Sequence, residues 1–118
     1  MAHLIASNTT RGTTILSDGW RASNPWSRFV GLLGYAGLKP GEGLHIIPCS
    51  SVHTCFMRFS IDVVYLNRDG QVVKIVPALK PFRFSIGGRG ARSVLELPVG
   101  TIAATGTQAG DQLALSEG

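Results

Sequence analysis

The sequence predicts a mainly-β fold, either a small jelly-roll-like sandwich or a partly closed barrel, with one or two short helices. Three observations lead to this fold class. Short runs of β-branched and aromatic residues recur along the 118 residues. Fifteen glycines and six prolines provide for many tight turns. Only one segment has the apolar spacing of a helix face.

The length and composition predict one domain that spans residues 1–118. The chain is close to the commonest size of a single domain. Hydrophobic residues make up 44% and charged residues 15% of the sequence, which argues against disorder. A chain of this length can bury a core without disulfide bonds.

The first third of the chain predicts a hairpin and then a helix. Residues 4–6 and 13–16 are expected strands on either side of a polar loop. Asn24 is a suitable N-cap, Pro25 a suitable first helical residue, and Gly34 a suitable end of the helix. Between them, apolar residues follow the i, i+3, i+4, i+7 spacing of one helix face: Trp26, Phe29, Val30 and Leu33.

The rest of the chain predicts short strands. They are expected at residues 44–48, 53–59, 61–66, 71–76, 93–97 and 112–115. The clearest pair precedes and follows Asp69-Gly70, because Asp-Gly is a strong hairpin-turn signal. Pro77 and Pro81 are expected to end this regular pairing, residues 87–90 to form a loop, and residues 98–106 to form a turn with one helical turn.

Several functional classes are not expected from the composition. The longest apolar run, Phe29–Leu38, has ten residues with three glycines, whereas a membrane-spanning helix needs about 20 apolar residues. The N-terminal residues lack the cationic stretch and long apolar core of a secretory signal. We therefore expect no membrane span and a cytoplasmic location.

The net charge of +4 is concentrated in a basic segment from Lys74 to Arg92, which holds five Lys and Arg residues and no acidic residue. Such a segment is either a solvated loop or the contact surface of a scaffold for an acidic protein partner. No two of its basic residues are adjacent, so we expect no nucleic-acid binding.

Reactive side chains are concentrated between Pro48 and Asp62. Cys49, His53 and Cys55 are potential metal ligands, but zinc sites usually contain closer cysteine pairs. We therefore expect no metal site and no cofactor, and we expect both cysteines to be reduced and buried as small apolar residues.

Four residues are candidates for binding a small ligand: His53, Arg58, Asp62 and Glu96. If residues 53–59 form a strand, His53 and Arg58 lie on opposite faces and converge on one ligand only through a bulge. Arg58 and Asp62 share a face but lie about 13 Å apart along an extended chain, so they meet only if the chain turns between them.

The two candidate carboxylates allow more than one interpretation. Asp62 adjoins a buried strand and needs a partner or a set of backbone amides, because an unpaired buried carboxylate is costly. Its role is therefore to orient His53, to bind a cation, or to anchor a strand crossing. Glu96 alternates with leucines and either faces solvent or pairs with an arginine.

A series of short motifs runs along the chain in this order: Gly31-Leu32-Leu33-Gly34, Pro40-Gly41-Glu42-Gly43-Leu44, Pro48-Cys49, His53-Thr54, Met57-Arg58, Ile61-Asp62-Val63, Asp69-Gly70, Leu95-Glu96-Leu97-Pro98, Gly100-Thr101 and Gly110-Asp111. This series resembles the prokaryotic family known as domain of unknown function 192, over nearly the whole chain from about Thr13 to Leu115. The most specific part is the stretch from His53 to Asp62.

The resemblance implies a small β-rich, jelly-roll-like fold and no established activity. Related sequences often carry a proline where this chain has Ser60, and an aromatic residue where it has Cys55. A role for Cys55 is therefore not expected to be a family property. His53, Arg58 and Asp62 remain the best candidates for a shared site.

Three functional hypotheses follow. The first is a non-catalytic binding or accessory module with a polar site near His53, Arg58 and Asp62. The second is a small hydrolase or lyase that uses His53 as a general base with a carboxylate, although no nucleophile motif accompanies this histidine. The third is the interaction scaffold with the basic segment. No catalytic residue is assigned.

Overall fold

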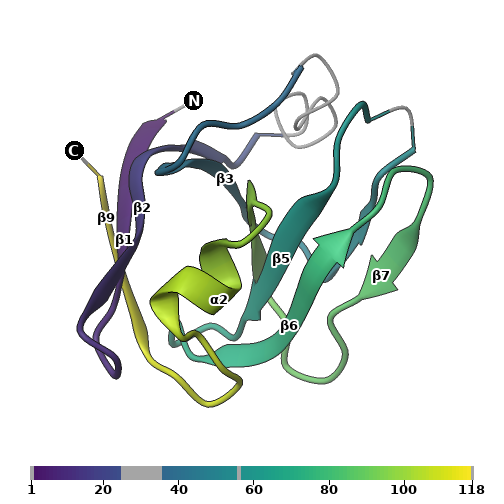
Figure 1. Cartoon of the computed structure of the whole chain (residues 1–118). Coiled ribbons are helices and arrows are strands. Elements are labelled where there is room, and N and C mark those ends of the chain that lie inside the picture. The colour runs from purple at the N-terminus through teal and green to yellow at the C-terminus, as the bar shows by residue number, and fades with distance from the viewer. Residues whose placement is uncertain (1, 25–35, 56, 118) are drawn as a thin grey trace.

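The computed structural model describes residues 2–24, 36–55 and 57–117 (Figure 1). The strands are β1 (Ala2–Asn8), β2 (Thr13–Ala22), β3 (Glu42–Ile46), β4 (Ser51–His53), β5 (Ile61–Leu66), β6 (Val72–Leu79), β7 (Phe84–Ile86), β8 (Ser93–Pro98) and β9 (Leu113–Glu117). The described helix, α2, covers Thr101–Thr105. Residues 25–34 of the helix predicted from Asn24 to Gly34 lie outside the described residues. No described helix has the length and apolar character needed to cross a membrane.

Seven strands form one curled sheet in the order β6-β5-β8-β3-β2-β1-β9, and β4 and β7 form a separate two-stranded ribbon. The two edges of the large sheet, β6 and β9, approach each other at a bridge between Gln71 and Gln112. Backbone hydrogen bonds support this contact, including Val72 N to Asp111 O at 2.8 Å and Leu113 N to Gly70 O at 3.0 Å. The sheet is therefore a partly closed barrel, as the sequence predicted.

The two faces of the curled sheet bury two different hydrophobic clusters. β5 shows this clearly because all six of its residues are buried. Val64 and Leu66 point to the inside of the barrel, where α2 fills one end (Figure 1). Val63 and Tyr65 point to the outside, where the ribbon covers them. Tyr65 links the large sheet to the ribbon, because its hydroxyl donates to the backbone oxygen of Ser85 on β7 at 3.0 Å.

The hairpin of β5 and β6 confirms the prediction from Asp69-Gly70, and Gly70 has the positive φ of 81° that the turn requires. The prediction that Pro77 ends the pairing is wrong, because β6 continues to Leu79. β6 is an edge strand of the sheet, and a proline on an edge strand need not interrupt a hydrogen-bond ladder.

The prediction of a strand at residues 53–59 is also wrong, because β4 ends at His53. Thr54, which is fully buried, uses its amide and hydroxyl for another segment: Thr54 N donates to Arg83 O at 2.9 Å, and Thr54 Oγ1 donates to Lys80 O at 2.6 Å. The chain then turns, with Met57 N donating to Thr54 O at 3.1 Å. The expected division of His53 and Arg58 between two strand faces therefore does not apply.

Candidate ligand-binding site

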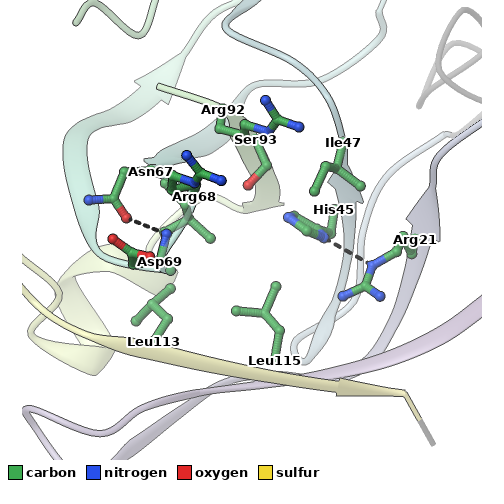
Figure 2. A pocket seen from close by; sticks show the side chains of 12 residues that line it. Arg21, His45, Ile47, Asn67, Arg68, Asp69, Arg92, Ser93, Leu113 and Leu115 are labelled. Atoms are coloured by element: carbon green, nitrogen blue, oxygen red, sulfur yellow. Dashed lines mark hydrogen bonds between the residues drawn. The ribbon is translucent and has the colours of Figure 1, made fainter. Parts of the chain in front are cut away.

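A cavity of about 430 Å³ lies at the mouth of the barrel. The first residues of β5 lie near α2, because Asp62 accepts a hydrogen bond from Ile102 N. The last residue of β5, Leu66, lines the cavity. The helix and the cavity therefore occupy opposite ends of the barrel. The apolar wall of the cavity includes Leu113 and Leu115 of β9 (Figure 2). A volume of this size suits a small-molecule ligand.

The polar side of the cavity begins with His45 on β3. Its neighbours Leu44 and Ile46 pack into the outer hydrophobic cluster, so His45 points to the inside of the barrel. The parallel pairing of β2 and β3 places Arg21 directly beside it. Only 3% of His45 is exposed to solvent, although its ring borders the cavity.

The hydrogen bonding of His45 fixes which ring nitrogen carries the proton. Arg21 Nε donates to His45 Nδ1 at 3.3 Å (Figure 2). Nδ1 is therefore an acceptor, and the proton of the neutral ring resides on Nε2. Among the described residues no atom accepts a hydrogen bond from Nε2, which is buried. His45 thus has a buried N–H donor without an acceptor among the described residues, in a ring that borders the cavity.

Two effects keep this ring neutral. Burial, and then the positive charge of Arg21, lower the pKa of His45 from 6.5 to about 4. At neutral pH the ring is a hydrogen-bond donor without a positive charge.

Two further arginines stand at the rim of the cavity. Arg68 is carried by the β5–β6 turn, and Arg92 by the segment that enters β8. Figure 2 shows both side chains at the edge of the cavity, across from Leu113 and Leu115. Both residues are exposed, and within the described parts of the chain no carboxylate lies within 4.0 Å of either guanidinium. Arg21, in contrast, pairs with Glu117 at 2.9 Å.

The segments that carry the rim arginines are held by backbone hydrogen bonds. Asn67 Oδ1 accepts from the amides of Asp69 and Gln71, each at 2.9 Å, which fixes the turn around Arg68. Arg92 N donates to Leu66 O at 2.8 Å. With three arginines and the single carboxylate of Asp69, the lining has a positive balance. A buried donor beside guanidinium groups is suited to binding an anion.

None of the four residues predicted from the sequence lines this cavity. Asp62 is 1% exposed, and its Oδ1 accepts from Ala78 N at 2.9 Å. Its Oδ2 accepts from Gly100 N at 3.2 Å and Ile102 N at 2.9 Å. Asp62 therefore has the set of backbone amides that one interpretation of the sequence required.

The other three predicted residues are spread over the outer side of the sheet. His53 is exposed opposite Phe84 in the ribbon, and among the described residues no carboxylate forms an ion pair with it. Arg58 is also exposed and forms no ion pair with Asp62. A ligand-binding role for these residues stays a prediction.

Glu96 is almost fully buried, with 4% of its surface exposed. It faces the outer hydrophobic cluster between its strand partners Leu44 and Val63. No ion pair joins it to an arginine within the described residues. Burial raises the pKa of Glu96 to about 7.

Sequence reasoning missed the cavity residues because they are far apart in the chain. Arg21, His45, Arg68 and Arg92 lie on separate elements that only the curled sheet brings together. One signal was available: His45 is the single polar side chain in the apolar run Leu44–Ile47. A lone polar residue in a buried strand needs a partner or a function.

The fold and the cavity define a class of small half-barrel domains with a ligand-sized mouth. The family model of domain of unknown function 192, described as "Uncharacterized ACR", matches residues 6–115. The chain therefore belongs to this family, which confirms the resemblance predicted from its motifs. The description of the family assigns no activity.

Individual relatives agree with this assignment. A UPF0127 protein of Pyrococcus furiosus is 38% identical over 112 residues, which cover 90% of this chain and 93% of that protein. A UPF0127 protein of Thermococcus sibiricus is 38% identical over 114 residues, covering 90% of this chain and 71% of that protein. A solved structure of a protein of unknown function from Novosphingobium aromaticivorans has a TM-score of 0.81 at 18% identity, covering 95% of this chain and 83% of that one. The likeness to this solved structure shows a shared fold and nothing about function.

Proposed function

We propose that this protein is a binding module that holds a small organic anion in the mouth of the half-barrel. The observation that carries the proposal is His45, whose ring borders a cavity lined by three arginines and whose buried Nε2–H has no acceptor among the described residues. A buried donor without a partner costs about 1–3 kcal/mol. A ligand oxygen that accepts from Nε2 would remove this cost.

The two sides of the cavity suggest the chemistry of the ligand. A carboxylate fits the side formed by His45 and Arg92, because guanidinium and N–H donors form strong, short hydrogen bonds to carboxylate oxygens. A short aliphatic group fits against Leu113 and Leu115. The preferred ligand is therefore a small carboxylate with an apolar tail.

A cytoplasmic site of action is part of the proposal. Its support is that Cys49 and Cys55 do not form a disulfide, as is usual in a reducing compartment.

Titration calorimetry with butyrate and with butyramide tests the proposal, because these two probes differ in charge but have similar shapes. We expect heat of binding from butyrate and none from butyramide. His45→Leu and Arg92→Gln should each weaken butyrate binding roughly tenfold or more, since a hydrogen bond to a charged group is lost.

Arg89→Gln is the matched control. Arg89 is exposed and lies three residues before Arg92, but it does not line the cavity. This variant should bind butyrate like the wild type. Equal binding of both probes, or equal loss in the Arg89→Gln and Arg92→Gln variants, would show that the mouth of the barrel is not an anion site.

A further inference from the structure

The outer face of β7 exposes large apolar side chains. Phe84 and Ile86 alternate with Ser85, so both point away from the core, and they are 65% and 56% exposed. Phe82, just before the strand, is 61% exposed. Figure 1 shows β7 at the outer edge of the molecule, on the side away from β9. We call Phe82, Phe84 and Ile86 the β7 face.

The segment that carries this face is firmly anchored. Buried Thr54 accepts from Phe82 N through its backbone oxygen at 3.0 Å and from Arg83 N through Oγ1 at 2.8 Å. Phe82 has a φ of 60°, a backbone conformation that is unusual and unfavourable for a bulky residue. The fold thus holds an aromatic side chain at the surface at a conformational cost.

Exposed cations lie beside the β7 face or next to it in the chain. Lys74 reaches it from β6, where its Nζ donates to Ile86 O at 2.7 Å. Lys80 and Arg83 lie in the anchored segment and are exposed. No acidic residue occurs between Gly70 and Leu95. Apolar side chains beside cations, without carboxylates, are typical of surfaces that attach to anionic lipids.

The size of the face favours a lipid surface over a protein partner. Three side chains that are about 60% exposed offer roughly 350 Å² of apolar surface, given about 200 Å² for each large side chain. A stable protein interface needs about 800 Å² from each partner. Lipid attachment requires only that a few apolar side chains enter the bilayer interface while cations contact the headgroups.

We propose that the β7 face attaches the protein to the surface of anionic phospholipid membranes. Phe82, Phe84 and Ile86 enter the interface, and Lys74, Lys80 and Arg83 contact the phosphate groups. This attachment is independent of anion binding at the barrel mouth.

Cosedimentation with vesicles tests this proposal. One set of vesicles contains phosphatidylcholine with about a third phosphatidylglycerol, and the other contains phosphatidylcholine alone. We expect the wild type to sediment with the anionic set, and less so as salt is added. Phe84→Ser combined with Ile86→Ser should reduce binding tenfold or more. Lys80→Gln combined with Arg83→Gln should reduce it about thirtyfold, since each cation near the surface contributes about one kcal/mol.

Val99→Ser is the matched control, because Val99 is an exposed apolar residue, 52% accessible, in the segment before α2. It should sediment like the wild type. All the changes are at exposed positions, and an unchanged thermal midpoint would verify folding. Absence of wild-type binding to anionic vesicles, or full binding by the Phe84→Ser and Ile86→Ser double variant, overturns the proposal. Retention of the wild type on immobilised polyglutamate without vesicle binding would also overturn it, in favour of an acidic protein partner.

Discussion

His45 is a residue whose surroundings favour a ligand more than they favour stability. Its ring is buried and neutral, with one nitrogen satisfied by Arg21 and the other without a partner among the described residues. A leucine of similar size would need no hydrogen bond at this position. The histidine therefore has an energetic cost that a binding function would explain.

The depressed pKa of His45 makes this cost depend on pH. The pKa is 6.5 in the unfolded chain and about 4 in the folded protein. As the pH falls below 6.5, the unfolded state binds a proton that the native state does not, so stability is lost. The loss reaches about 3 kcal/mol near pH 4.

The His45→Leu variant should not show this loss. Its free energy of unfolding should equal or exceed the wild-type value at pH 7, and its advantage should grow as the pH is lowered towards 4. Urea unfolding of both proteins across this range measures the difference. Parallel pH curves would contradict the burial of a neutral histidine.

The raised pKa of Glu96 predicts a pH dependence of stability that is opposite to that of His45. Burial raises the folded pKa of Glu96 to about 7 from 4.5. Between these values the unfolded state releases a proton that the native state keeps, so stability is full below pH 4.5 and is lost as the pH rises to 7. Glu96→Gln cannot titrate and should be more stable than the wild type by about 3 kcal/mol above pH 7.

Urea unfolding from pH 4.5 to above 7 checks this expectation. The Glu96→Gln and His45→Leu variants are controls for each other, because their advantages should appear at opposite ends of the pH range. A Glu96→Gln advantage that does not change with pH would contradict the burial of this carboxyl group.

At the level of elements, Asp62 links β5 to α2 and to the part of β6 where the register with β5 shifts. The helix is short, and its N-cap, Gly100, offers no side-chain hydrogen bond. The carboxylate of Asp62 supplies acceptors for Gly100 N and Ile102 N, and for Ala78 N in β6. Three elements therefore depend on one side chain.

Asp62→Ala should lower the free energy of unfolding by about 3–5 kcal/mol, because it leaves backbone amides without acceptors in a buried site. Asp62→Asn keeps one acceptor oxygen, so its free energy of unfolding should fall by less. This variant is the control that stays folded. Hydrogen exchange at the amides of Ala78 and Ile102 should accelerate in both variants, while butyrate binding at the opposite end of the barrel persists. A change below about 1 kcal/mol in Asp62→Ala would exclude this anchoring role.

Across the whole molecule, the two ends of the barrel differ in their packing. α2 and Asp62 fill one end with buried contacts, and the other end holds the cavity, which is lined by residues of β3, β9 and the β5–β6 turn. Outside the barrel, the β4–β7 ribbon covers the second hydrophobic cluster and carries the β7 face. The barrel mouth thus belongs to the seven-stranded sheet, and the β7 face belongs to the separate ribbon.

The features that depend on neighbouring residues could be predicted from the amino-acid sequence. Asp69-Gly70 specified the β5–β6 hairpin, the glycine and proline content specified a fold of short strands, and the ordered motifs identified the family. These signals are local, since turn geometry and strand preference act over a few residues. The sequence also indicated that the Asp62 carboxylate needed a partner or backbone amides as hydrogen-bond donors, although it left the choice open.

Only the tertiary structure decided where the strands end and which polar groups meet. β4 stops at His53 because Thr54 bonds to a segment almost thirty residues later, a contact that no local pattern contains. The cavity likewise depends on the curling of the sheet, which places Arg21, His45 and Arg92 around one space. Strand pairing over long separations sets that curl, and periodicity along the chain does not encode which strands become neighbours.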